Sequence, residues 1–215
     1  MPTPEFAGFL AAVASRLRHD LKGGLITLRM GLEALPEQED LKPLLLERTL
    51  HLESLADKLV LLLRMGQMRP EKARLSAVLG EFRTQVRDRF PHLELSLPAD
   101  LGDARPTVDA DALIYALMEL AENAHLAGAG KLDLQAETSN QGQLQLTLRD
   151  DGRGPEPTDA GENLPALLAL GVSRWGRAGL GLAIAEMCAR GHGGGLTLSP
   201  VAPGWQVELR LGETS

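Results

Sequence analysis

The sequence predicts an α+β protein in which an N-terminal helical hairpin precedes a sandwich of helices packed on one β-sheet. Apolar residues recur every three or four positions through the first part of the chain, as on one face of a long helix. Beyond residues 65–70, short stretches of alternating apolar residues appear between further helical patterns. The 215-residue chain is long enough for both parts. We therefore expect one domain over residues 1–68 and a second over 69–215.

The first domain is predicted to be two long helices. Apolar positions run from Phe6 to Leu35, a polar turn follows at 36–40, and a second stripe runs from Leu41 to Leu63. Two long helices joined by a short turn form an antiparallel hairpin. One hairpin cannot cover stripes this wide, so we expect a homodimer in which two copies form a four-helix bundle.

The second domain is predicted to alternate helices and strands. The patterns place helices at Leu75–Phe90, Asp109–Leu126 and Leu180–Arg190, and strands at Leu93–Leu97, Leu132–Ala136, Leu144–Leu148, Leu196–Leu198 and Val207–Leu211. Each strand pattern has a single apolar face. We therefore expect one sheet with all helices on the same side.

Composition excludes several function classes. The formal net charge of −7 argues against nucleic acid or an anionic membrane as the main partner. Cys188 is the only cysteine, so no internal disulfide can form, and a reducing compartment is expected. We find no apolar window long enough for a membrane span and no secretion signal, which predicts a cytoplasmic protein.

His19 is the first candidate functional residue. It lies about 200° around the predicted helix from Leu17 and Leu21, so it should face water, with Asp20 beside it. One interpretation is a charged outer face that contains a histidine, and this stretch alone favours it. The other is an accessible imidazole nucleophile whose proton is taken by the adjoining carboxylate.

Two downstream clusters combine polar groups suited to a nucleotide. Glu119 and Asn123 lie one helical turn apart and could position a water molecule or Mg²⁺, although a solvated helix flank is the simpler reading. Asp150 follows a strand and could accept a hydrogen bond from an exocyclic amine. Gly152 and Gly154 would let the backbone approach a flat ring, although an ordinary Asp-Gly turn explains the same residues.

A third cluster is the glycine-rich helix entry around Gly179 and Gly181. Backbone amides at a helix N-terminus form an anion site, and glycines allow phosphate to come close. A Gly-x-Gly alone is weak evidence, but its place between a loop and a helix strengthens it.

Together, the order and spacing of these motifs resemble the catalytic core of bacterial sensor histidine kinases over almost the whole chain. His19–Lys22 resembles the H box, Glu119–Asn123 the N box, Asp150–Gly154 the G1 box and Gly179–Leu182 the G2 box. The resemblance implies a dimerisation and phosphotransfer hairpin followed by a Bergerat-type α/β sandwich that binds ATP. It implies an ATP-dependent protein-histidine kinase whose partner is the receiver domain of a response regulator. Input is expected from a partner such as a separate sensor protein, from the residues before Phe6, or from a longer parent chain.

The resemblance also implies roles for individual residues. His19 would be the phosphoacceptor and Asp20 its base, while Asp150 would bind the adenine amine and Asn123 would hold Mg²⁺. The amides around Gly179, Leu180 and Gly181 would contact the phosphates. We further expect residues 154–176 to form a lid, with Arg174 or Arg177 neutralising the charge that develops on the phosphates.

The chain departs from the family pattern at five places, and the departures at Leu126, at Arg177 and in the F box keep an alternative open. Glu119, a general base for water in related ATPases, replaces the usual first Asn, Leu126 replaces a basic residue, and Arg177 replaces a glycine. The F box is not recognisable, and Gly23 stands where the family has the Thr or Asn tied to phosphatase activity. The alternative is an ATP-independent phosphotransfer relay with a degenerate ATPase-like domain, and a purely scaffolding dimer is a third reading.

Overall fold

A computed structural model describes residues 68–139, 143–154 and 180–212, together with residues 20, 21, 23, 24, 26–28, 30, 31, 44, 45, 48, 52, 58 and 65. The chain divides into two compact units. The first comprises Met1–Leu63 and Ala169–Leu180, and the second comprises Arg64–Leu168 and Gly181–Ser215. The predictions for His19, the turn at 36–40 and the lid lie outside the described residues.

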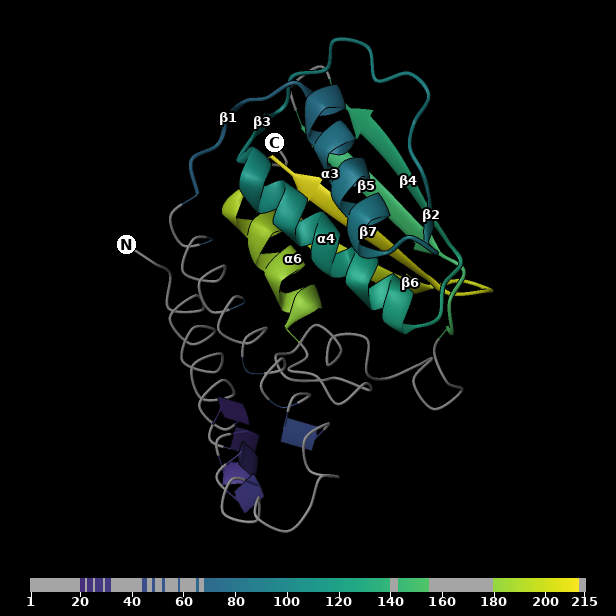
Figure 1. Ribbon diagram of the computed structural model, residues 1–215. Helices are drawn as coiled ribbons and strands as arrows, with labels where there is room; N and C mark the ends of the chain where they lie inside the picture. Colours follow the sequence, from purple (N-terminus) through teal and green to yellow (C-terminus); the bar gives the residue numbers. More distant parts are fainter. Residues whose placement is uncertain are drawn as a thin grey trace. The chain divides into compact units, whose positions relative to one another are not determined.

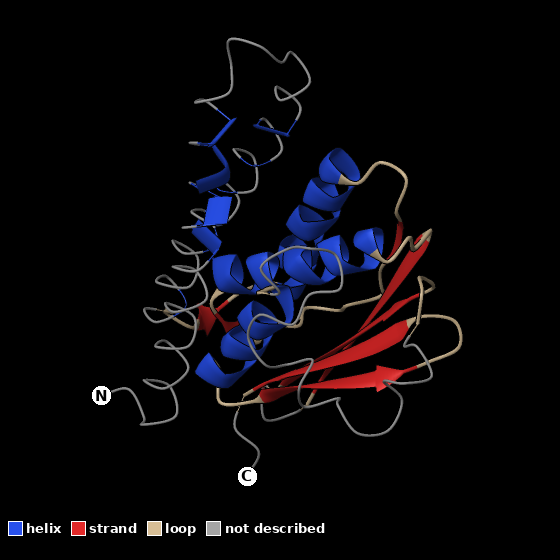
Figure 2. Ribbon diagram, turned by 90° about the horizontal axis from the view of Figure 1, so that it is seen from below, coloured by secondary structure: helices blue, strands red, loops and turns tan. Residues whose placement is uncertain are grey.

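The second unit is an α+β sandwich. Its helices are α3 (Leu75–Arg89), α4 (Ala110–Leu126) and α6 (Gly181–Gly191), and they lie together on one face of the sheet (Figures 1 and 2). Its five strands are β2 (Glu94–Ser96), β4 (Lys131–Thr138), β5 (Leu144–Asp150), β6 (Gly195–Pro200) and β7 (Trp205–Leu211). The predicted helical layer on a single face is therefore confirmed for the described residues.

The sheet has the strand order β2-β4-β5-β7-β6 and is mixed. Strand β2 runs parallel to β4, whereas the other pairings are antiparallel. Strand alternation explains the buried face of β5, because Leu144, Leu146 and Leu148 are all buried while the two residues between them are half-buried. Asp150 ends β5 on this same face, which directs its side chain toward the helical layer.

Helix α4 is the central element of the core. It lies between α3 and α6 in the helical layer, and most of its residues are buried, including Leu113, Leu117 and Leu120 (Figure 1). In α6, Cys188 is fully buried, and burial together with the charge of Asp109 raises the pKa of its thiol to about 12. It is a core residue, as predicted, and an unreactive thiol.

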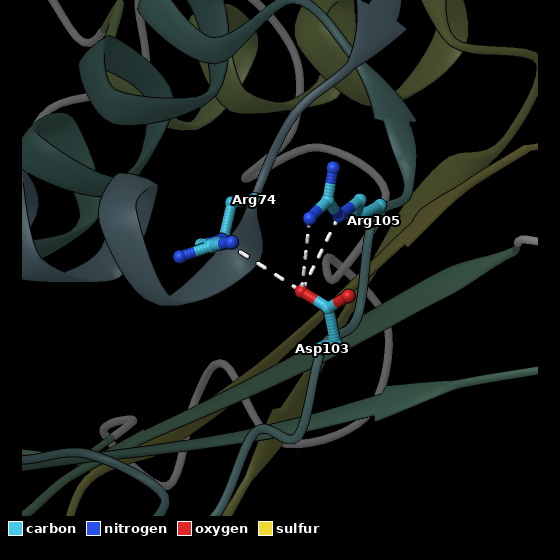
Figure 3. A network of polar contacts seen from close by, with 3 residues as sticks. All are labelled: Arg74, Asp103 and Arg105. Carbon is cyan, nitrogen blue, oxygen red and sulfur yellow. Dashed lines mark hydrogen bonds and ion pairs between the residues drawn. The ribbon is translucent and has the colours of Figure 1, made fainter.

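Two short strands flank α3 and β2 in the sequence. β1 (Glu71–Lys72) pairs antiparallel with β3 (Thr107–Val108), and neither was predicted. The loop before β3 is held on the start of α3, where Asp103 Oδ1 lies 3.7 Å from Arg74 Nε and 3.3 Å from Arg105 Nε and Nη2 (Figure 3). All three side chains are exposed, so each ion pair contributes at most about 1 kcal/mol.

The described residues of the first unit are helical, and two glycines among them lie against leucines. A Cβ added to Gly24 would lie 2.8 Å from Leu52 Cδ2, and one added to Gly31 would lie 2.5 Å from Leu45 Cδ2. Gly23, in contrast, is exposed and has nothing within 4 Å of such a Cβ. Among the residues described in either unit, no helix is both long and apolar enough to cross a membrane.

Candidate functional site

The first polar cluster lies on α4. The apolar stripe of this helix is buried as expected, and Glu119 and Asn123 lie at its edge. Glu119 is only 8% exposed and Asn123 is half-buried. The simpler reading of a solvated flank is therefore wrong for Glu119, because a carboxylate is rarely buried without a structural or functional partner.

Glu119 and Asn123 both reach the first residue of α6. A Cβ added to Gly181 would lie 3.0 Å from Glu119 Oε2, 3.0 Å from Asn123 Nδ2 and 3.3 Å from Asn123 Oδ1. Glycine allows this close approach, since a larger residue would push the ends of these side chains aside by a few tenths of an ångström. The structure thus brings Gly181, from the glycine-rich helix entry, together with Glu119 and Asn123.

The Asp-Gly cluster meets the C-terminal end of α4. Asp150 Oδ1 accepts a hydrogen bond of 2.9 Å from the N–H of Gly152. A Cβ added to Gly152 would lie 2.9 Å from that of Ala127, the C-cap of α4, and the N–H of Arg153 donates to the Ala127 carbonyl at 2.9 Å. Gly152 is therefore needed for close packing, one turn beyond Asn123.

The two neighbouring aspartates have different roles. Asp151 Oδ1 accepts from the N–H groups of both Gly130 and Lys131 at 2.8 Å, so Asp151 fixes the loop before β4. Asp150 instead points toward the helical layer. Burial raises the pKa of the Asp150 carboxyl above its ordinary value, the Asp151 charge adds to this, and the backbone N–H groups of Gly152 and Trp205 oppose it.

The β6–β7 hairpin supplies residues that the sequence reasoning missed. Gly204 has a φ of +90°, and a Cβ there would collide with the Asp150 carbonyl oxygen, so only glycine allows this approach. The β5–β7 register pairs Arg149 with Gln206, which places Trp205 opposite Asp150. The buried residues Val207 and Leu209 alternate with Trp205, so its side chain shares the Asp150 face. The alternation was a signal that could have identified Trp205.

His125 does not replace the absent basic residue at position 126. Its ring stacks on Phe90 at the end of α3, with centroids 5.0 Å apart and planes at 30°. Glu122, beside it, is buried and lies 3.1 Å from Arg89 Nη2. Because α3 and α6 flank α4 on opposite sides, these contacts direct His125 away from Gly181 (Figure 1).

Of the remaining predicted site residues, the structure describes some and not others. Gly154 is half-buried, and a Cβ there would lie 3.2 Å from the Gly204 carbonyl oxygen. Leu180 is buried directly before α6. Asp20 is helical and half-buried in the first unit, whereas His19, Arg177 and Gly179 lie outside the described residues.

Comparison with known proteins agrees with this arrangement. Residues 108–215 match the family of histidine kinase-, DNA gyrase B- and HSP90-like ATPases. No curated protein matches the sequence.

Several solved structures share the fold. The histidine kinase AdeS of Acinetobacter baumannii superimposes with a TM-score of 0.69 at 21% identity, over 92% of this chain and 98% of that chain. The histidine kinase ThkA, solved in complex with the response regulator protein TrrA, gives 0.73 at 15% identity, over 98% of this chain and 64% of that chain. The histidine kinase domain of the Escherichia coli osmosensor EnvZ gives 0.51 at 25% identity, over 70% of this chain and 93% of that chain.

Proposed function

Since the chain belongs to the family of histidine kinase-, DNA gyrase B- and HSP90-like ATPases, we propose that it is a two-component histidine kinase. It phosphorylates His19 from ATP and passes the phosphoryl group to an aspartate of a response regulator. One observation carries the proposal: all three nucleotide clusters meet the C-terminal half of α4. Gly181 lies against Glu119 and Asn123, and Gly152 lies against Ala127 one turn further on.

Nucleotide recognition is assigned to groups on both layers. The Asp150 carboxylate, partly desolvated at the end of β5, accepts the adenine amine, and Gly152 and Gly154 admit the ring. The backbone amides of Gly179, Leu180 and Gly181 at the start of α6 contact the phosphates. Arg177 adds positive charge there.

The donor set fits a magnesium ion. Mg²⁺ prefers hard oxygen ligands and takes one or two of them from a protein and the rest from phosphates and water. Asn123 and Glu119 supply an amide oxygen and a carboxylate oxygen near Gly181. Within the described residues no cluster of three His, Cys, Asp or Glu side chains could hold a metal by itself, which agrees with a shared site. The ion would neutralise phosphate charge during transfer.

The chemical step moves one phosphoryl group. A nitrogen of the His19 imidazole forms a bond to the γ-phosphorus while the bond from that phosphorus to the β–γ bridging oxygen breaks, and ADP leaves. Asp20, next in sequence, takes the imidazole proton. The protein contributes mainly positioning and charge neutralisation in such a transfer. In the second half-reaction an aspartate oxygen of the receiver takes the phosphoryl group and the imidazole leaves.

The first unit is assigned to phosphotransfer and dimerisation over residues 1–68, with the nucleotide-binding domain over 69–215. The Gly24–Leu52 and Gly31–Leu45 approaches support an antiparallel hairpin, because positions rise along one segment as they fall along the other. Ile26, Met30 and Leu44 are exposed in the single chain, which favours a second copy that covers them. The input comes from a partner such as a separate sensor protein, from the residues before Phe6, or from a longer parent chain, and the use of ATP favours a cytoplasmic reaction.

One observation favours a second candidate function. With Leu126 in place of a basic residue and His125 stacked on Phe90, this turn of α4 offers no cation to the phosphates. An ATP-independent histidine phosphotransfer relay would tolerate that loss. The relay predicts no heat of binding when a non-hydrolysable ATP analogue with Mg²⁺ is titrated to millimolar concentration.

The deciding experiment is labelling of the full chain with γ-labelled ATP and Mg²⁺, followed by an acid-lability test of the product. We expect acid-labile label on the protein, none on His19→Gln, and normal label on His92→Gln, a matched change at an exposed histidine. Asp150→Asn should lose both labelling and nucleotide binding, whereas His19→Gln should lose only labelling. Label that persists in His19→Gln would contradict the proposed phosphoacceptor.

A further inference from the structure

Asp109 makes three hydrogen bonds that tie three separate segments together. Its Oδ1 accepts from the N–H of Ala112 at 3.0 Å and caps α4. Its Oδ2 accepts from the N–H of Arg69 at 2.8 Å, forty residues earlier in the chain. Its own N–H donates to His192 Nε2 at 2.8 Å, in the turn after α6. A single residue thus joins the start of α4, the end of α6 and the segment that enters the second unit.

His192 is a fixed part of this junction. It is 8% exposed, and both ring nitrogens have partners. The Asp109 N–H can only donate, so Nε2 is the acceptor, and Nδ1 carries the proton that it donates to the Cys188 carbonyl at 2.7 Å. The end of α6 is therefore fastened to the start of α4.

The segment Met68–Pro70 is seated on the same junction. Besides the Arg69 N–H bond, Met68 lies so close to Gly191 that a Cβ there would collide with its Cε. Directly after this segment, β1 pairs with β3, which ends one residue before Asp109. Residues 68–70 lie a few residues after Arg64, where the second unit begins, on the covalent route from the segment that contains His19 to α3.

The two helices joined at Asp109 carry the nucleotide clusters at their far ends. Asn123 is fourteen residues along α4 from Asp109, a distance of about 21 Å at 1.5 Å per residue. Gly181, which Asn123 approaches, begins α6, and Gly191 ends it. Any ligand that fixes Asn123 against Gly181 therefore acts on the same helix pair that Asp109 fixes at the opposite ends.

We propose that Asp109 is a positioning residue that couples the docking of Met68–Pro70 to nucleotide binding. The inference rests on the proposed nucleotide-binding function. When the segment is docked, the Asp109 carboxylate holds Arg69 on the start of α4, while the Asp109 backbone N–H holds the end of α6 through His192. The two helices are then kept in the arrangement that sets Glu119 and Asn123 against Gly181, so the nucleotide binds more tightly. The effect is reciprocal by thermodynamic linkage: a bound nucleotide must favour the docked segment by the same factor.

The variant Asp109→Asn separates the tie from the helix cap. Asparagine is as good an N-cap as aspartate, but its amide has only one acceptor oxygen for the two N–H groups of Arg69 and Ala112. Asp111→Asn is the matched control, because Asp111 is an exposed acid in the first turn of the same helix. Arg69→Pro removes the donor from the other side and leaves the Asp109 side chain unchanged.

Two measurements on the full chain test the coupling. Calorimetry with a non-hydrolysable ATP analogue and Mg²⁺ should give an affinity at least about fivefold weaker for Asp109→Asn and Arg69→Pro, and unchanged for Asp111→Asn. Amide hydrogen exchange at residues 68–72 should slow by the same factor when the analogue binds. That slowing should be absent in Asp109→Asn, a result that a purely structural cap would not produce.

The outcomes distinguish the two proposals. Equal affinities in all four proteins, with exchange at 68–72 indifferent to the analogue, overturn the coupling and leave the proposed kinase intact. No binding by the unsubstituted protein at millimolar analogue overturns the kinase and the coupling with it. If Asp109→Asn does not fold, Arg69→Pro provides the same comparison.

Discussion

Gly23 and Gly24 are neighbouring helical residues for which the same substitution should have different effects. A Cβ on exposed Gly23 meets nothing within 4 Å, whereas one on buried Gly24 would lie 2.8, 3.1 and 3.3 Å from three carbons of Leu52. The Gly23 carbonyl, which accepts from Thr27 Oγ1 at 3.0 Å, is retained in alanine. The pair therefore isolates one contact between two helical segments of the first unit.

The expected magnitudes follow from two opposing terms. Alanine in place of glycine inside a helix contributes about 1 kcal/mol to the free energy of unfolding, so Gly23→Ala should stabilise by that amount. Gly24→Ala gains the same but overpacks Leu52, since carbons normally meet at about 3.5–4.0 Å. Overpacking costs about 1–3 kcal/mol, so Gly24→Ala should be neutral to destabilising by about 2 kcal/mol.

The assay is urea unfolding of the full chain followed by circular dichroism, with hydrogen exchange of the N-terminal segment to assign the transition. Adding Leu52→Ala should reverse the cost of Gly24→Ala by removing the overlapping atoms, and the pair should be non-additive. If Gly24→Ala stabilises as much as Gly23→Ala, the segments around Gly24 and Leu52 do not pack in solution. The hairpin part of the proposed function would then be wrong.

Two further predictions concern the sheet side of the nucleotide site. The pKa of Asp150 in the folded protein is raised above its ordinary value of 3.8, so the folded state holds the carboxyl proton more tightly than the unfolded state. The free energy of unfolding of the nucleotide-free protein should therefore fall as the pH rises from 3.8 to the folded-state pKa. Asp150→Asn should remove that part of the pH dependence in unfolding curves while abolishing nucleotide binding. Trp205→Ala should weaken nucleotide binding roughly 5- to 100-fold, the range of one base–aromatic stack. In Trp175→Phe, which leaves Trp205 as the only tryptophan, nucleotide should change the fluorescence, and an unchanged spectrum would contradict the placement.

The elements of the second unit could be predicted because their periodicity is local and strong. The alternation of Leu144, Leu146 and Leu148 is sufficient to predict β5, and the apolar stripe of α4 to predict that helix. Strands β1 and β3 have two residues each, too few for any period to be detected. The parallel direction of β2 could not be predicted either, because α4 separates it from β4 in the chain and no turn links them.

The candidate site was predicted in part for the same reason. Asp150, Asn123 and Gly181 lie in motifs that are compact in sequence, and the structure brings Asn123 against Gly181, whereas the binding roles of all three stay predictions. His192 is a lone histidine after a helix, and its partner Asp109 is 83 residues away, so no local pattern could reveal the bond. Asp109 illustrates the limit: the sequence predicts a helix start there, but the tie to Arg69 depends on tertiary packing.

The buried and half-buried polar groups of the second unit can be divided into structural and functional ones. The criterion is whether the protein itself supplies the interactions that offset the cost of burying each group. Glu122 lies 3.1 Å from Arg89, and His192 has a hydrogen-bond partner at each ring nitrogen, so both have compensation that the fold itself provides. Asp150 accepts backbone N–H groups too, yet burial still raises its pKa, so its ionised form remains under-solvated in the free protein. An under-solvated carboxylate lowers the stability of the free protein. Such groups are found mainly at functional sites, where a ligand supplies the missing interaction. An amine donor placed against Asp150 would supply it, and adenine carries one.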